Sequence, residues 1–197
     1  MINRIIEEIN VCMNNNCYLA ALSTALTLPD VCGLAEYGEK APVGYRYKSW
    51  IDKFVFEYDE GKYKDKFNIS LGEVVYNLRN NTLHSLKFSV NNKNINKFEL
   101  LIQNVNTSSL TCCDIASVRD GNYNYLCISV PSLIIKICDV VKEYYHNNKE
   151  KFKFLEDKIV LMSKRKARMF GLNVGIDNYF DVFKLDESKA KTKWNKI

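Results

Sequence analysis

The sequence has few of the residues that build metal sites and lacks the short motifs of common hydrolases and nucleotide-binding enzymes. Only two histidines and no Cys-x-x-Cys pair occur among its 197 residues, so the ligand spacings of zinc sites are missing. No Gly-x-Ser-x-Gly motif occurs, and segment 171–175, though it begins and ends with glycine, lacks the Lys-Ser/Thr of a phosphate-binding loop. We therefore expect no metal and no cofactor.

Long apolar runs and an even set of cysteines are also missing. No run of 18 apolar residues occurs, and Glu7 and Glu8 interrupt the N-terminal segment, so we expect neither a membrane span nor a signal peptide. The seven cysteines are an odd number, and we expect them to be reduced, mostly buried thiols of a cytoplasmic protein. The net charge of +5 is compatible with a nucleic-acid partner and equally with a basic surface that aids solubility.

Hydrophobic periodicity predicts a mainly α-helical fold. Helical spacing of apolar residues occurs in segments 2–13, 17–27, 45–58, 70–86, 132–146 and 149–162. We expect the second of these helices to stop before Pro29, because the residue preceding a proline disfavours the helical conformation. The length suits a single domain, residues 1–197, built as a helical bundle.

A change of composition after residue 88 predicts a β insertion in this bundle. Three short runs rich in β-forming residues lie at 97–103, 110–118 and 123–130, and Asp120-Gly121-Asn122 is a turn signal. We expect a small antiparallel insertion, a hairpin or three strands, within about 90–130, with its strands at about 95–130. A Lys-rich tail at about 187–197 is expected to be frayed and flexible.

The clearest helix start in the chain is at Ser70, where Ser70-Leu71-Gly72-Glu73 matches a capping box. At 100° per residue, the apolar side chains of this helix fall within about 60° of Leu71 and form its core face. Four polar residues follow one another on the opposite face. They are Glu73, Asn77, Asn80 and His84. The helix therefore carries one continuous polar stripe, and Arg79 lies on its flank.

Arg79, Asn80 and His84 in this helix have the side chains that phosphodiester cleavage requires. A guanidinium binds phosphate, and an imidazole accepts or releases a proton near neutral pH. Asn80 precedes His84 by four residues on the same face, so it could orient the imidazole or donate to a phosphate oxygen. Glu73 and Asn77 would support this polar face. The alternative is an exposed histidine without a chemical role.

The pattern Arg79-Asn80-x-x-x-His84 resembles the signature of the HEPN superfamily, in which arginine, a polar residue and a histidine lie on one helix of an α-helical bundle. The resemblance implies a metal-independent ribonuclease, in which Arg79 stabilises the phosphorane and His84 transfers protons. It also implies a homodimer with two motifs in a shared cleft, RNA as substrate, and an antitoxin or nucleotidyltransferase partner in a toxin–antitoxin or phage-defence system. The expected β insertion departs from the plain bundle of this superfamily. The other function class is a non-catalytic module that binds a protein or nucleotide.

Two further clusters have a functional and a structural interpretation. Lys164, Arg165, Lys166 and Arg168 could bind an RNA backbone, or could be a solvated helix end whose cations favour the helix dipole. Segment 45–50 alternates aromatic and basic residues, as base-stacking surfaces do, but its helical spacing also suits a packed core.

Overall fold

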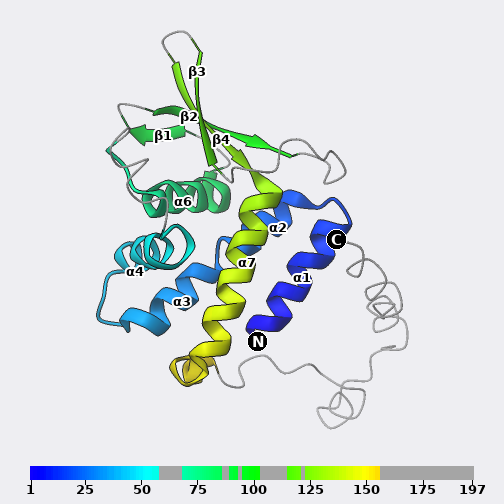
Figure 1. Ribbon diagram of the computed structural model, residues 1–197, viewed down its shortest axis with the longest axis vertical. Coiled ribbons are helices and arrows are strands. Elements are labelled where there is room, and N and C mark those ends of the chain that lie inside the picture. Colours follow the sequence, from blue (N-terminus) through cyan, green and yellow to red (C-terminus); the bar gives the residue numbers. More distant parts are fainter. Residues whose placement is uncertain (58–67, 86–88, 93–94, 103–114, 121–122, 156–197) are drawn as a thin grey trace. The chain divides into compact units, whose positions relative to one another are not determined.

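The computed structural model of the protein describes residues 1–57, 68–85, 89–92, 95–102, 115–120 and 123–155 (Figure 1). All of these residues belong to one compact unit of the chain, Met1–Glu156. The basic cluster at 164–168 and the tail at 187–197 lie outside the described residues. The prediction of a single domain over 1–197 stays a prediction.

The described part of the chain is mainly helical, which confirms that part of the predicted fold. The α-helices are α1 (Ile2–Asn14), α2 (Tyr18–Ala25), α3 (Leu28–Tyr37), α4 (Val43–Trp50), α6 (Leu71–Asn80) and α7 (Val130–Asn147). Two of them continue as π-helices, η1 (Ile51–Val55) after α4 and η2 (Asn81–Ser85) after α6, and a 3₁₀ segment, η3 (Lys149–Leu155), follows α7.

A helix that the periodicity did not predict follows α2 directly and includes Pro29. Helix α3 begins at Leu28 and places Pro29 in its first turn. A proline is tolerated there because the first helical N–H groups have no carbonyl partner within the helix. The break between α2 and α3 is therefore confined to Leu26 and Thr27.

Helix α7 forms the centre of the helical core. It packs against α1, α2 and α3, and Figure 1 shows it running beside α1. Its buried face includes Ile137 and Val141, which have no exposed surface. Burying one such side chain stabilises the fold by about 1.5–3 kcal/mol. The rings of Trp50 and Phe54 pack on Tyr144 of α7, with centroids 5.5 and 4.9 Å away, which extends the core to α4 and η1.

The stretch Tyr18–Tyr37 is, by length and composition, apolar enough to cross a membrane, with a mean hydropathy of 1.3. It comprises α2 and α3, and half of it is buried inside the protein. Leu22, Leu26 and Leu28 have no exposed surface at all. Packing in the core of the bundle accounts for the apolar character of these helices.

The β insertion is a mixed sheet of four strands in the order β1-β2-β4-β3. The strands are β1 (Ser89–Asn92), β2 (Ile95–Leu101), β3 (Ile115–Asp120) and β4 (Tyr123–Ser129). The outer pairs, β1 with β2 and β3 with β4, are antiparallel. The central pair is parallel, with Phe98 of β2 beside Leu126 of β4, so the prediction of an antiparallel insertion is wrong.

The direction of the central pair could not be read from the strand pattern, because side chains alternate between faces in both parallel and antiparallel strands. The turn signal after β3 selects an antiparallel neighbour, and β3 and β4 do pair from Asp120 and Tyr123 onward. A parallel pair needs a connection of about a dozen residues or more. The segment between β2 and β4, which contains β3, is long enough for this connection.

Two glycines allow α4 to approach both of its neighbours closely. A Cβ atom on Gly33 of α3 would lie 2.8 Å from the Arg46 carbonyl oxygen of α4. A Cβ atom on Gly72 of α6 would clash with the carbonyl oxygen of Lys48 and lie 2.8 Å from a carboxylate oxygen of Asp52. The same Asp52 side chain accepts a hydrogen bond of 2.6 Å from the Gly72 N–H. Backbone therefore packs on backbone in the three-helix unit of α3, α4 and α6.

We expect Gly72→Ala to lower the free energy of unfolding by about 1–3 kcal/mol, because overpacking moves backbone that cannot yield. Gly44→Ala is the matched control, since the atoms nearest to its Cβ would be at the hydroxyl end of the Tyr76 side chain, the first at 3.3 Å. Urea unfolding followed by circular dichroism measures both variants. Equal stabilities for Gly72→Ala and the wild type would contradict the close contact.

Candidate functional site

Helix α6 carries the predicted motif on its outer face, because its opposite face is buried in the core. Ser70 is the N-cap, and its hydroxyl accepts a hydrogen bond of 3.1 Å from the Glu73 N–H. Leu71, Val74, Val75 and Leu78 are buried, as the helical wheel predicts. His84, at the end of the same segment, is exposed. The prediction of a core face and an outer face is confirmed.

A change of helix type separates Asn80 from His84. The α-helix ends at Asn80, and Asn81–Ser85 form the π-helix η2. A π turn closes i→i+5 hydrogen bonds and is wider than an α turn, and such turns are frequent at functional sites. In a continuous α-helix, Arg79 and His84 would be about 140° apart around the axis. The wider turn advances by a smaller angle per residue, so it moves His84 toward the side that carries Arg79.

The Arg79 side chain extends to the first turn of α3 and binds Asp30. Its Nε and Nη2 both donate to Oδ2 of Asp30, at 3.1 and 2.8 Å. Its Nη1 donates to Oδ1 of Asn80 at 2.9 Å. A guanidinium has five N–H groups, so two remain without a partner among the described residues. The Arg79 and Asp30 side chains are 20% and 24% exposed, so this ion pair is partly buried at the protein surface.

Tyr47 of α4 lies at this junction of α3 and α6. It has no exposed surface, and its hydroxyl donates to the Leu26 carbonyl oxygen at 3.0 Å. Burial, and then the charge of Asp30, raise the pKa of the Tyr47 phenol well above its ordinary value. The hydroxyl therefore stays protonated and donates, and the ring of Tyr76 packs on Tyr47 with centroids 5.3 Å apart.

Glu73, on the polar stripe, also finds a partner on α4. Its carboxylate binds Nζ of Lys48 at 2.7 Å, rather than the N-cap backbone as the capping box predicts. Both side chains are about one-third exposed, so solvent screens this pair. Asn77 is partly exposed on the same helix. Glu73 therefore links α6 to α4. On the polar stripe beside the motif, Asn77 is the side chain that stays partly exposed to solvent.

The aromatic–basic segment at 45–50 is divided between core and surface. Tyr47 and Trp50 are fully buried, which confirms the core interpretation for these two rings. Tyr45 is 55% exposed and packs edge-on against Tyr37, with centroids 5.6 Å apart. Tyr45 is therefore the ring of this segment that a nucleobase could reach.

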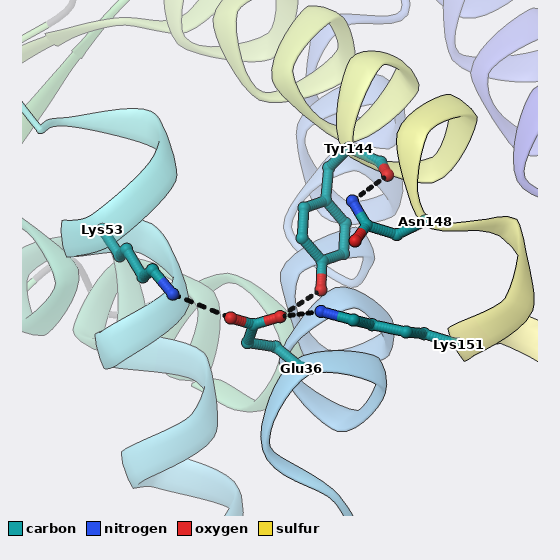
Figure 2. Close-up of polar contacts among 5 residues, drawn as sticks. All are labelled: Glu36, Lys53, Tyr144, Asn148 and Lys151. Carbon is teal, nitrogen blue, oxygen red and sulfur yellow. Dashed lines mark hydrogen bonds and ion pairs between the residues drawn. The ribbon is translucent and has the colours of Figure 1, made fainter.

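A second polar cluster, which the sequence did not point to, surrounds Glu36 near the end of α3 (Figure 2). Figure 2 shows Lys53 approaching the Glu36 carboxylate from one side and Tyr144 and Lys151 from the other. Lys53 lies 2.8 Å from Oε1, while Oε2 accepts 2.7 Å from the Tyr144 hydroxyl and also binds Lys151. These contacts join α3 to η1, α7 and η3.

The donors around Glu36 change its ionisation. Partial burial acts to raise the pKa of Glu36, but the hydrogen bonds from Lys151, Lys53 and Tyr144 outweigh it and lower the pKa to about 2. Burial and the Glu36 charge raise the pKa of Tyr144. The carboxylate is therefore ionised and the phenol protonated at neutral pH, as a structural cross-link requires.

A hollow of about 340 Å³ shares no lining residue with either cluster. Its lining residues are Asn3, Asp139, Lys142, Glu143, Tyr145, His146 and Lys149. None of the motif residues lines it, so the candidate site is a surface of α6 and α3 and not this hollow. Among the described residues, no group of three or more His, Cys, Asp or Glu side chains could hold a metal ion.

The structure therefore brings two of the predicted site residues, Arg79 and Asn80, into direct contact and leaves His84 exposed beyond the π turn. Sequence reasoning missed Asp30 as the partner of Arg79. The sequence signal for it was weak: an aspartate in the first turn of a helix, where it also favours the helix dipole. The predicted RNA-binding cluster of Lys164, Arg165, Lys166 and Arg168 lies outside the described residues.

Comparison of the chain with protein-family models, with curated proteins and with solved structures finds no match.

We expect Glu36→Gln to lower the free energy of unfolding by about 1–3 kcal/mol at pH 7, because three donors lose a charged acceptor. The folded pKa of Glu36, about 2, lies below its ordinary value of 4.5. Its contribution is therefore complete above pH 4.5 and is lost as the pH falls toward 2. The difference between variant and wild type should shrink over this interval.

Unfolding curves at a series of pH values test this, with Glu39→Gln as the control because Glu39 is exposed on the loop that follows α3. A pH-independent difference for Glu36→Gln would show that the charge of the carboxylate does not matter.

Proposed function

We propose that the protein is a HEPN-like, metal-independent endoribonuclease whose site is formed by Arg79, Asn80 and His84. The main support for this proposal is the hydrogen-bonding of the Arg79 guanidinium. Its guanidinium is held by Asp30 and Asn80 at 2.8–3.1 Å, yet two of its N–H groups have no partner among the described residues. An arginine oriented in this way is prepared to bind a phosphate, and the exposed His84 follows five residues later.

The proposed reaction needs only the side chains of this site. His84 removes the proton from a ribose 2′-hydroxyl, whose oxygen attacks the adjacent phosphorus. The bond from phosphorus to the 5′-oxygen breaks, and the leaving oxygen takes a proton from an imidazolium. Arg79 stabilises the charge on the phosphorane. The product is a 2′,3′-cyclic phosphate, together with a 5′-hydroxyl.

Asn80 has a more specific role in this proposal than its spacing from His84 suggests. Its Oδ1 accepts from Arg79, and the π turn begins directly after it. Because the carbonyl is engaged, the side-chain NH₂ is the group that can donate to a phosphate oxygen. Asn80 therefore acts with Arg79 on the phosphate, and His84 acts on the two ribose oxygens.

In this proposal the protein acts in the cytoplasm as a homodimer. The dimer would combine two histidines in one cleft, so that one serves as base and the other as acid. RNA is the substrate, and an antitoxin or nucleotidyltransferase would restrain the activity in a toxin–antitoxin or phage-defence system. Lys164, Arg165, Lys166 and Arg168 would add phosphate contacts to the RNA backbone. Glu73 and Asn77 would border the site.

A non-catalytic protein- or nucleotide-binding module is the second candidate, and one observation favours it. The charge of Arg79 is already matched by the Asp30 carboxylate at 2.8 Å. An arginine used only to tie α3 to α6 would look the same in this respect. The two candidates differ in whether His84 is needed for turnover.

We expect the purified protein to cleave single-stranded RNA in excess EDTA. His84→Ala should reduce kcat by about 10²–10⁴-fold, because general acid–base catalysis contributes this much. Arg79→Ala should reduce it by about 10²–10³-fold, by analogy with the loss of one oxyanion donor. His146→Ala is the matched control, since it removes the only other histidine, an exposed residue of α7.

Equal cleavage by all four proteins would assign the activity to a contaminant or to another site. Absence of cleavage by any of them, with folded protein, would reject the ribonuclease and favour the binding module. Mapping the ends of the products separates the proposed chemistry from hydrolysis, because only attack by the 2′-oxygen forms a cyclic phosphate.

We expect light scattering to give twice the mass of one chain, 22.9 kDa. If the two motifs share a cleft, mixed dimers of wild type and His84→Ala should have less than half of the wild-type activity per dimer. A monomer with full activity would contradict the shared cleft but not the cleavage itself.

A further inference from the structure

The Asp30–Arg79 pair has a geometry that goes beyond charge neutralisation. Both contacts from Arg79, through Nε and Nη2, end on the same oxygen, Oδ2 of Asp30. A third contact, from Nη1 to Oδ1 of Asn80, restrains the other edge of the planar guanidinium. A planar group that is restrained through all three nitrogens has lost its freedom to rotate. Its two remaining N–H groups, one on Nη1 and one on Nη2, therefore have a defined direction.

The backbone that carries Asp30 lies in the packed part of the fold. Asp30 lies in the first turn of α3, where the helix dipole favours a negative charge. Gly33, one turn further along, lets α3 approach the backbone of α4 closely. Behind the pair, buried Tyr47 of α4 donates to the Leu26 carbonyl oxygen. The backbone at the start of α3 is therefore closely packed, and the carboxylate that it carries accepts both of its hydrogen bonds from Arg79.

We infer that Asp30 is a positioning residue of the candidate site, which orients Arg79 so that its free N–H groups bind one phosphodiester of single-stranded RNA. This inference rests on the proposed function for its substrate. Asp30 does not touch the RNA. It acts through Arg79, because misplacing a charged group by about 1 Å can cost on the order of 10² in rate.

Charge and positioning predict opposite results when the Asp30 carboxylate is made neutral. Asp30→Asn removes a negative charge beside the site, and charge alone would strengthen the binding of a polyanion. Positioning predicts weaker binding and slower turnover, because a neutral amide holds a guanidinium less firmly than a carboxylate does. A purely structural tie would lower thermal stability and leave both binding and kcat unchanged well below the melting temperature.

The first test measures kcat and KM for single-stranded RNA in EDTA at fixed ionic strength, well below the melting temperature of each protein. Asp30→Asn should lower kcat at least tenfold without lowering KM. Asp30→Glu, which keeps the charge, should recover part of the loss. Glu36→Gln is the matched control, because it breaks another carboxylate cluster of α3 and should change stability but not kcat.

A wild-type kcat for Asp30→Asn would overturn the inference while leaving the ribonuclease in place. If Asp30→Asn fails to fold by circular dichroism, Asp30→Glu takes its place, because moving the carboxylate by one methylene should still lower kcat in a folded protein. Unchanged turnover in that variant would also reject the positioning role.

The second test separates this inference from the proposed function. Fluorescence anisotropy measures binding of a 2′-O-methyl RNA oligonucleotide, which has phosphates but cannot be cleaved by 2′-oxygen attack. If the wild type does not cleave RNA but binds this probe, and Arg79→Ala and Asp30→Asn both raise Kd at least threefold, the ribonuclease fails and the positioning of Arg79 stands. No binding by the wild type, or an unchanged or lower Kd for Asp30→Asn, would overturn the inference.

Discussion

The close packing of α4 between α3 and α6 is the constraint on which the candidate site depends. Gly33 and Gly72 leave no room for a side chain where these helices meet α4, so their backbones approach directly. This close packing brings the first turn of α3 within reach of the end of α6, and Asp30 meets Arg79 near the buried Tyr47, whose phenol is affected by both charges. A wider spacing would leave the Arg79 charge in solvent, where it would have no fixed direction.

The same unit explains how a site can form without a deep cleft. A surface arginine ordinarily spreads over many rotamers, and ordering it costs free energy when a ligand binds. In this protein that cost is met on folding, by contacts with Asp30 and Asn80. The Asp30 carboxylate also offsets the positive charge of Arg79. The site would therefore select a phosphate by the direction of the Arg79 N–H groups more than by long-range attraction.

The Glu36 cluster uses similar chemistry for a different purpose. Its carboxylate accepts from three donors on elements far apart in sequence, and its pKa falls to about 2. Within the cluster, Lys53, Tyr144 and Lys151 all donate to the Glu36 carboxylate (Figure 2). The cluster therefore acts as a cross-link between α3, η1 and the end of α7. Asp30, at the other end of α3, binds Arg79 of α6. One helix thus carries a structural carboxylate and a carboxylate that holds the candidate site.

The sequence by itself determined most of the helical segments, where α6 begins and which of its faces is buried, because capping chemistry and the 3.6-residue period act locally. It also indicated Arg79, Asn80 and His84 as one group. It did not predict α3, which begins beside Pro29. Tertiary structure alone decided that β2 and β4 run parallel, since alternation is the same for either direction. It likewise decided that η2 widens after Asn80 and that Asp30, 49 residues away, holds Arg79. Such long-range pairs leave no periodic trace in a sequence, because they depend on how closely helices pack.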